Sequence, residues 1–577
     1  MKDQYTIKHR AARAAPVGLA GLAALAAGVA LGLQAAQRPP ENILVNQPAG
    51  PPHSISSRGF SAVPLAPHVL QAMRQQGKAF KDPAPNSANR GRKFNPQGEL
   101  IGPLTIDPVQ KVLLICVEFT TLPPGGPVER LDLTYFDDLL FGTVYDPPEY
   151  APYPGHPTDR TLKNYYQEVS YGKVDVVTLN LPTTIGWAQA GKPYDYYCRA
   201  DGIHDNGFGP YPENVQGLVI DAIKAVDSVV DFSQYAINGE VPTLLVVHAG
   251  TAAEWSSDPT IIWSHQADLT EGTGLNGYWA DGVKINTYAM MNEVGGDLTA
   301  YWTSGSGPFP PTVGTFAHEW GHVLGLPDQY DYGYESDGTG NYSSMATGDW
   351  GWSCPGANYP DYLMFLGNSP AHFDAWSKYR LGFVTPVKVE PGLPVSVVLN
   401  PVEFAPIVYR MDVPNSGGKE YFLLENRQHI GFDQGLVTTT SHDPELIRTG
   451  DHGLAIWHID DTVLTRNYWR VNEAQNWKEF RSEGWKKAWT GETHYGISII
   501  QADDQWHLER AVWSGGDAAD LYPGALGVTR FGNDTHPNSS SYYFWPGSGP
   551  KYGLSGVTVN NITEVDGVIT AVLSYTR

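Results

Sequence analysis

Two histidines four residues apart, with a glutamate beside the first, are the residues in this sequence whose types and spacing point most directly to chemistry. In the stretch His318-Glu319-Trp320-Gly321-His322, a helix would place both histidines on one face. Imidazole nitrogens in that arrangement can share one zinc ion at about 2.0–2.1 Å. Glu319, turned slightly aside, could take a proton from an attacking water, which is the general-base role in metal-assisted peptide hydrolysis.

A third ligand is expected just beyond this helix. Gly325 favours the left-handed conformation that ends helices. The reversed chain then brings Asp328 back toward the metal and leaves a fourth position open for water. Asp331 is the nearby alternative. Glu335 would serve if the third ligand came from a second helix, but residues 332–343 are rich in glycine and turn-forming residues.

The elements that must position this stretch are predicted from apolar periodicity and end signals. The zinc helix should begin at Thr312, a plausible N-cap, and end at Gly325. A buried strand is expected at Lys111–Thr120. Amphipathic helices are expected at Thr161–Val169 and Glu213–Val230. Other predicted elements are a short helix between Leu65 and Met73, strands at Val241–Val247, Thr260–Ser264 and Val283–Met291, and a helix from Ser369 to Gly382.

The zinc stretch resembles the zincin metalloproteases, and its continuation past Gly325 resembles the metzincin pattern with an aspartate in place of a third histidine. Ser343-Ser344-Met345-Ala346-Thr347-Gly348 is similar to the methionine turn that lies beneath the metal in metzincins. Further segments resemble one family, the M6 metallopeptidases typified by the immune inhibitor A proteases. These segments are Ser170-Tyr171-Gly172-Lys173, Val246-Val247-His248-Ala249-Gly250, Trp263-Ser264-His265, Leu326-Pro327-Asp328-Gln329-Tyr330-Asp331, Ala375-Trp376-Ser377-Lys378, Glu420-Tyr421-Phe422-Leu423-Leu424-Glu425-Asn426-Arg427 and Gly453-Leu454-Ala455-Ile456-Trp457-His458-Ile459-Asp460.

This resemblance covers roughly residues 108–460 and implies a secreted zinc endopeptidase with protein or peptide substrates. It also implies that a strand shortly before the zinc helix, with Val283–Met291 the nearest, forms the cleft edge to which an extended peptide adds. Tyr330 is a candidate to donate a hydrogen bond to the developing oxyanion, with packing as the alternative role. His248 and His265 are interpreted as structural residues rather than ligands.

A carbohydrate-binding or adhesive protein built on a non-catalytic protease-like scaffold is the competing hypothesis. Four tryptophans could stack on sugars or pack between domains: Trp469, Trp477, Trp485 and Trp489. Glu319 argues against this hypothesis, because a scaffold has no use for a base beside its metal. A serine hydrolase is disfavoured because the sequence contains no Gly-x-Ser-x-Gly motif.

The net charge of −23 argues against nucleic acid as a partner and fits an exported protein. Acidic clusters at Asp460-Asp461, Asp503-Asp504 and Asp517 to Asp520 could hold structural calcium, although none has the spacing of a known calcium loop. Of the three cysteines, Cys116 lies in an apolar run. Cys198 and Cys354 lie in loop-like surroundings, where they could form a disulfide or remain free.

Four parts are predicted along the chain. Residues 1–36 have the basic start, apolar run and terminal small residues of a secretory signal peptide; if it is not cleaved, the same run is long enough to anchor the chain in a membrane. Residues 37–107 are interpreted as a pro-region or a disordered linker. Residues 108–384 are the predicted zinc metalloprotease domain. Residues 385–577 show short strands separated by turns, which indicate a β-sandwich. The expected fold class is therefore α+β, a metzincin-like zinc protease domain followed by a β-sandwich.

Overall fold

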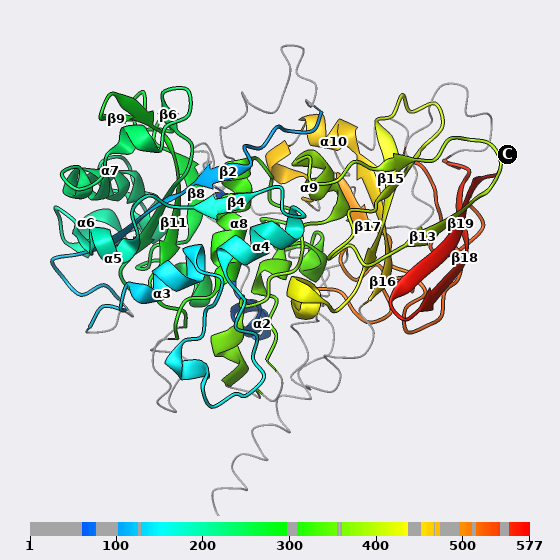
Figure 1. Ribbon diagram of the computed structural model, residues 1–577, viewed down its shortest axis with the longest axis horizontal. Coiled ribbons are helices and arrows are strands. Elements are labelled where there is room, and N and C mark those ends of the chain that lie inside the picture. The colour runs from blue at the N-terminus through cyan, green and yellow to red at the C-terminus, as the bar shows by residue number, and fades with distance from the viewer. Residues whose placement is uncertain are drawn as a thin grey trace, which may run out of the picture. The chain divides into compact units, whose positions relative to one another are not determined.

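The structure is a computed structural model of the 577-residue chain. It describes residues 61–76, 102–124, 129–296, 309–354, 357, 361–436, 452–466, 468–473, 495–509, 515–542 and 553–576. All of these belong to one compact unit, Ser54–Arg577. Its mixed helix and sheet content, visible in Figure 1, agrees with the predicted α+β class. The predicted signal peptide lies outside the described residues.

A six-stranded mixed sheet organises the region before residue 384. The strand order is β1-β8-β11-β7-β3-β5; β7 runs parallel to both β3 and β11, and β8 runs antiparallel to β11. The bounds are β1 Ser61–Ala62, β3 Leu113–Glu118, β5 Ala188–Gln189, β7 Leu244–His248, β8 His265–Asp268 and β11 Thr287–Asn292. The strand predicted at Lys111–Thr120 is confirmed as β3, and five of its six residues are buried.

Helices that begin at polar caps pack around this sheet. The helix α7 (Val215–Val226) packs against β3, α8 (Val313–Leu324) packs against β11, and α4 (Leu162–Val169) packs against α8. The side chains of Thr161 and Asn214 accept hydrogen bonds from the amides of Asn164 and Gly217, the usual stabilising device at a helix start. The two amphipathic helices predicted from periodicity are therefore confirmed, with α7 shorter at both ends.

The described residues also form shorter helices and strands. The remaining helices are α2 Pro67–Gln75, α3 Thr134–Phe136, α5 Pro182–Ile185, α6 Tyr194–Tyr197, α9 Ala375–Arg380 and α10 Asp461–Arg466. The remaining strands of this region are β2 Val109–Lys111, β4 Asp175–Val177, β6 Glu240–Val241, β9 Tyr278–Ala280 and β10 Val283–Ile285. Among the described residues, no helix has the length and apolar character needed to cross a membrane.

The prediction of one continuous strand at Val241–Val247 is wrong. It divides into β6 and β7 around Pro242, whose nitrogen carries no hydrogen for a ladder bond. The strand predicted at Val283–Met291 likewise divides into β10 and β11, which belong to different sheets. The break falls at Asn286, whose backbone oxygen and side chain accept hydrogen bonds from the amides of Leu269 and Thr270.

The prediction of a strand at Thr260–Ser264 is also wrong, because the strand begins only at His265. The Asp258 side chain accepts hydrogen bonds from the backbone and hydroxyl of Thr260, which favours a turn over an extended ladder. The helix predicted from Ser369 starts instead at Ala375. There Asp374 caps it by accepting from the amide of Ser377.

Two further sheets lie in the C-terminal part. One has five strands in the order β12-β14-β15-β16-β17, and the other has three in the order β13-β19-β18. Their bounds are β12 Val387–Lys388, β13 Val395–Leu399, β14 Tyr409–Asp412, β15 Glu420–Arg427, β16 Gly453–Asp460, β17 Ile497–Ile499, β18 Val557–Val565 and β19 Val568–Tyr575. Figure 1 shows β18 and β19 at the red end of the chain, beside the yellow and orange strands β15, β16 and β17.

The five-stranded sheet has two buried faces. Along β15, Tyr421 and Leu423 belong to the apolar cluster that surrounds the six-stranded sheet, whereas Phe422 and Leu424 belong to a second cluster shared with β13, β18 and β19. Alternate residues of a strand point to opposite faces, so the sheet separates the two clusters.

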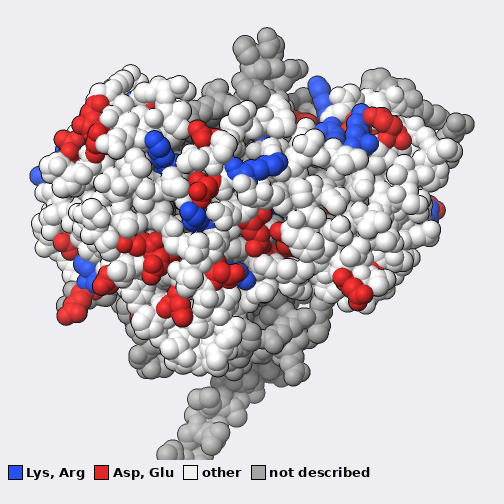
Figure 2. All heavy atoms as spheres, viewed as in Figure 1, with Lys and Arg blue, Asp and Glu red and all other residues white. Residues whose placement is uncertain are grey.

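Acidic and basic side chains are scattered over the face of the molecule shown in Figure 2.

Candidate metal centre

Helix α8 brings the two predicted histidine ligands together. His318 and His322 lie one turn apart and are completely buried, and their Nε2 atoms are 3.1 Å from each other. The helix begins after Thr312, as predicted, but the Thr312 hydroxyl donates to the carbonyl of Leu366 and does not cap the helix. The two imidazoles point toward one another, so a single ion can contact both nitrogens.

The helix ends at Gly325, which has the left-handed conformation that the sequence predicted (φ 113°). The amide of Gly325 donates to the carbonyls of Gly321 and His322, and the amide of Leu326 also donates to Gly321. This pattern is a Schellman motif, in which a left-handed residue reverses the chain at the end of a helix. The reversal carries the following residues back past the histidines.

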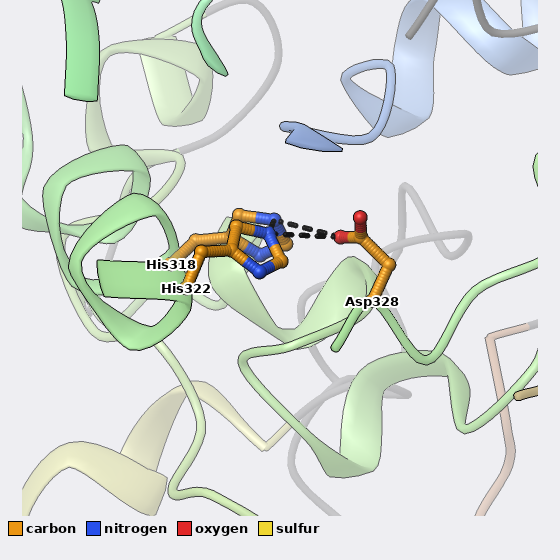
Figure 3. A group of neighbouring side chains, drawn as sticks. All are labelled: His318, His322 and Asp328. Carbon is orange, nitrogen blue, oxygen red and sulfur yellow. Dashed lines mark hydrogen bonds and ion pairs between the residues drawn. The ribbon is translucent and has the colours of Figure 1, made fainter. Parts of the chain in front are cut away.

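Asp328 completes a group of three possible ligands. Its Oδ1 lies 3.2 Å from Nε2 of His318 and 3.1 Å from Nε2 of His322, and its side chain is fully buried. Figure 3 shows the two imidazoles and the carboxylate converging on one point. Burial alone would raise the pKa of Asp328, but the adjacent imidazoles hold it well below its usual range.

Hydrogen bonds on the opposite ring nitrogens set the orientation of both histidines. Nδ1 of His318 lies 2.7 Å from the carbonyl of Ser344, and Nδ1 of His322 lies 2.9 Å from the carbonyl of Leu326. A carbonyl only accepts, so each Nδ1 carries a hydrogen, and a neutral ring then has a free lone pair on Nε2. Burial also lowers the pKa of His318, which favours this neutral form.

Met345 lies beneath the zinc helix, as the resemblance to a methionine turn implied. A Cβ atom added to Gly321 would lie 2.6 Å from the Met345 sulfur. The glycine therefore allows the turn to approach the helix closely. Because the preceding residue, Ser344, bonds His318, this close packing also positions a candidate ligand.

Glu319, the predicted general base, is fully buried on the same helix. Its carboxylate is close enough to Tyr288 of β11 to contribute, after burial, to a raised pKa of that phenol. The Tyr288 hydroxyl in turn bonds Nε2 of His265. Glu319 therefore lies on the helix that carries the two candidate histidine ligands, with its carboxylate near Tyr288 of β11.

Tyr330, the predicted oxyanion donor, instead donates its hydroxyl to the carbonyl of Ala62 at 2.7 Å. The tyrosine that bonds a candidate ligand is Tyr332, whose hydroxyl donates to Oδ2 of Asp328. Tyr332 was not predicted as a functional residue, although it lies four residues after Asp328 in a loop rich in aromatic residues. The role of Tyr330 in catalysis remains a prediction.

The alternative ligands have other partners. The Asp331 carboxylate accepts from the amide of Gly333 and the hydroxyl of Ser336, and Glu335 is exposed. His248 and His265 are buried, and their Nδ1 atoms bond backbone carbonyls. Burial lowers the pKa of His248 to about 4 and that of His265 to about 3, which agrees with a structural role.

Two other sequence predictions concern cysteines and calcium. Cys198 and Cys354 are both buried and are not joined to each other by a disulfide, which decides between the two alternatives that the sequence left open. Asp503 and Asp517 do approach one another, but the third member of their group is His507, a residue that the acidic pattern did not include. A histidine nitrogen is a poor ligand for calcium, which prefers oxygen.

Comparison with known proteins connects this geometry to one family. Residues 110–382 match the family described as immune inhibitor A peptidase M6, catalytic domain. Immune inhibitor A from Bacillus thuringiensis subsp. alesti is 31% identical over 273 residues, which are 42% of this chain and 36% of that protein. The pre-pro-metalloprotease PrtV from Vibrio cholerae serotype O1 is 25% identical over 305 residues, 47% of this chain and 29% of that protein.

The matched segments thus span about a third of the length of these relatives. The resemblance to the M6 peptidases, predicted from short motifs, is confirmed over residues 110–382. That range contains the whole candidate metal centre.

Proposed function

We propose that the M6 peptidase catalytic domain at residues 110–382 makes this chain a zinc-dependent endopeptidase that hydrolyses peptide bonds in proteins. The observation that carries the proposal is the triangle formed by Nε2 of His318, Nε2 of His322 and Oδ1 of Asp328, with sides of 3.1 to 3.2 Å. This triangle lies inside the segment that matches the catalytic domain of a peptidase family.

The triangle fits a zinc ion. Ligand atoms of a tetrahedral zinc site at about 2.0–2.1 Å from the metal lie about 3.3 Å from one another. Two imidazoles and one carboxylate are a known ligand set for catalytic zinc, and they leave the fourth position for water or substrate. The unprotonated Nε2 atoms face each other at close range, an arrangement that a cation between them stabilises.

When bound, a zinc ion supplies a Lewis acid that polarises the scissile carbonyl and acidifies a water molecule. His318, His322 and Asp328 would hold the metal, and the Tyr332 hydroxyl bonds the Asp328 carboxylate and keeps it in place. We assign to Glu319 the removal of a proton from the attacking water and its delivery to the leaving amine. Tyr330 is retained as a candidate donor to the oxyanion, a role that requires its hydroxyl to leave Ala62.

The proposed location of the enzyme is outside the cell. The Vibrio relative is named a pre-pro-metalloprotease. We propose a corresponding organisation here, with a signal peptide at residues 1–36, a pro-region within residues 37–107 and the catalytic domain at 108–384. For residues 385–577 we propose a β-sandwich, supported by the two sheets that share one apolar cluster.

The proposal is tested by measuring zinc content and casein hydrolysis in the same preparations, with and without a chelator. The Glu319→Gln protein should keep its zinc but lose about 10²–10⁴-fold in hydrolysis, the range that general acid–base catalysis contributes. Chelation should abolish the hydrolysis by the unmodified chain, and added zinc should restore it. Undiminished hydrolysis by the Glu319→Gln protein would reject the mechanism.

A further inference from the structure

The C-terminal part contains a second group of side chains with the types and spacing of metal ligands. One nitrogen of His507 and one carboxylate oxygen from each of Asp503 and Asp517 lie within 4.8 Å of one another. Nδ1 of His507 is 3.2 Å from Oδ2 of Asp517. Neighbouring ligand atoms around a tetrahedral zinc ion are separated by about 3.3 Å. The pair of His507 and Asp517 therefore has the spacing that one ion needs.

Backbone amides hold the two aspartates so that one oxygen of each is left for this group. The amide of Gln505 donates to Oδ1 of Asp503, and the amide of Ala519 donates to Oδ1 of Asp517. Oδ2 of Asp517 faces His507, and Oδ2 of Asp503 is buried and accepts no hydrogen bond from the described residues. Contacts that orient a ligand in this way are characteristic of metal sites.

A fourth carboxylate, that of Asp520, points to a cation independently of this spacing. Its side chain is completely buried. Oδ2 accepts from the amide of Asp517 at 2.7 Å and from the hydroxyl of Tyr342 at 3.0 Å, whereas Oδ1 has no hydrogen-bond partner in the described part of the chain. Burial raises the pKa of Asp520, and the charges of Asp517 and Asp503 raise it further. A buried oxygen of this kind is costly unless a cation or a donor satisfies it.

The negative charge of the group exceeds what one imidazole can balance. Burial, followed by the charge of Asp517, raises the pKa of Asp503, and the neighbouring His507 only partly offsets that rise. Asp520 adds a further carboxylate next to Asp517. Buried charges require partners of opposite sign, and a divalent cation would supply that charge at one point.

The ligand types favour zinc over the calcium that the acidic pattern suggested. Calcium takes six to eight oxygen ligands, whereas imidazole together with carboxylates is a ligand set for zinc. Asp504, the neighbour of Asp503 in that pattern, instead accepts from the indole of Trp506 at 2.8 Å. The histidine therefore decides the class of metal.

The segment that carries this group packs against the loop that leads to the methionine turn. The amide of Asn341 donates to the carbonyl of Gly515, and the amide of Gly515 donates to the carboxylate of Asp337. The amide of Asp337 in turn donates to the carbonyl of Leu508. An ion that ties residues 503–517 together would reduce the freedom of this segment to leave the loop.

We propose that Asp503, His507 and Asp517 bind a second zinc ion, next to the buried carboxylate of Asp520, and that this ion is structural. It fastens the segment 503–520 to the loop 337–342, which lies between the third candidate ligand and the methionine turn. The site is distinct from the candidate metal centre, and the proposal does not depend on the proposed function.

The test counts zinc in the full chain after equilibration with Zn²⁺ and removal of unbound metal. The unmodified chain should hold two zinc ions, and the His507→Ala chain should hold one. Asp503→Asn, which keeps the size of the side chain and removes its charge, should also leave one. His536→Gln is the matched control, an exposed histidine of the same region, and should leave two. Two zinc ions in both the His507→Ala and Asp503→Asn chains would overturn the proposal.

Hydrogen–deuterium exchange tests the structural role in the His322→Ala chain, in which the candidate metal centre has lost a ligand. Added Zn²⁺ should slow the exchange of the amides of Asn341 and Asp517 about tenfold, because both amides donate within the contacts that the ion fastens. The same concentration of Ca²⁺ should not, and neither should Zn²⁺ after His507→Ala is added. No effect of Zn²⁺, or an equal effect of Ca²⁺, would overturn the proposal.

The zinc counts also separate this proposal from the proposed function. A single ion that is lost in the His507→Ala chain and kept in the His322→Ala chain would support the second site and reject the catalytic zinc. A single ion with the opposite dependence would reject the second site and leave the peptidase.

Discussion

At the scale of single residues, the candidate centre depends on which hydroxyl and carbonyl groups contact its ligands. His318 and His322 are oriented by carbonyls of Ser344 and Leu326, and Asp328 is oriented by the hydroxyl of Tyr332. Such outer contacts fix the tautomer and direction of a ligand and tune its basicity. Tyr330 and Tyr332, two residues apart, therefore have different partners: the Tyr330 hydroxyl donates to the carbonyl of Ala62, and the Tyr332 hydroxyl donates to the candidate ligand Asp328.

Replacement of Tyr332 by phenylalanine should weaken zinc binding by about 10–100-fold, the usual cost of losing an outer hydrogen bond to a ligand. Tyr330→Phe is the matched control, because its hydroxyl bonds the Ala62 carbonyl and not a ligand. Competition with a zinc chelator measures both affinities. Equal affinities in the two variants would contradict the assignment of Tyr332.

Stability should depend on pH through Glu254, whose pKa is raised from 4.5 to about 7 by burial. Because the folded state favours the neutral acid, its stabilising effect is complete below the unfolded pKa of 4.5. It is lost as the pH rises toward and past 7. The shift in the pKa of Glu254 between the unfolded and folded states corresponds to a loss of roughly 3 kcal/mol in the free energy of unfolding at high pH.

The Glu254→Gln chain should therefore lose less stability than the unmodified chain between pH 4.5 and 8. Urea unfolding of both chains at several pH values, in the same zinc concentration, provides the comparison. The difference between the two curves isolates Glu254 from Asp461 and Glu473, whose pKa values burial also raises to about 7. Parallel curves for the two chains would show that Glu254 does not titrate in this range.

At the scale of elements, helix α8 is fixed at both ends. Near its start, Gly314 lies so close to the backbone that an added Cβ would be 2.0 Å from the carbonyl oxygen of Asp349 and 2.9 Å from Cα of Gly367. At its end, Gly325 reverses the chain and leads it to Asp328. The helix therefore cannot slide or rotate without breaking the triangle of candidate ligands.

Gly314→Ala should destabilise the folded chain by about 1–3 kcal/mol or more, because backbone atoms cannot move aside as a flexible side chain can. Zinc affinity should fall as well, since the displaced helix carries both histidines. Gly102→Ala is the control: nothing lies within 4 Å of its added Cβ, so stability and affinity should stay unchanged. If Gly314→Ala changed stability and zinc affinity as little as Gly102→Ala does, the close approach of Gly314 to the backbone of Asp349 and Gly367 would not be needed.

At the scale of the whole molecule, buried charges join the five-stranded sheet of the C-terminal part to the region before residue 384. Lys378 of α9 pairs with Glu425 of β15 at 3.3 Å, and both side chains are fully buried. Arg427 bonds Asp433 through two nitrogens and also donates to the carbonyl of Tyr342, close to the methionine turn. These residues lie on both sides of the predicted domain boundary at 384.

Arg427→Met should cost about 3–5 kcal/mol, because it leaves buried carboxylates without their cation. Arg530→Met is the control: its ion pair with Asp534 is exposed, and no measurable change is expected. Calorimetry of the unmodified chain should show the region before residue 384 and the five-stranded sheet unfolding in one transition. Two well-separated transitions would mean that the buried charges do not couple the parts.

The sequence alone determined the candidate ligands and general base, because His318, Glu319, His322, Gly325 and Asp328 lie within eleven consecutive residues. Helical periodicity and one left-handed glycine determine which of these side chains lie near one another. The two amphipathic helices and the short strands of residues 385–577 were likewise predictable from local patterns. The M6 resemblance rested on further short segments between Ser170 and Asp460.

Only the tertiary structure decided which strand forms the sheet edge, what lies on it and which tyrosine contacts the third ligand. These features depend on contacts between residues far apart in the sequence, such as Ala62 with Tyr330 and Val63 with Trp263. The errors at Thr260–Ser264 and Ser369 have a related origin, because side chains of Asp258 and Asp374 bond the backbone and override apolar patterning. Local patterns specify elements, whereas pairing between distant segments specifies the order of the strands and what lies at the sheet edge.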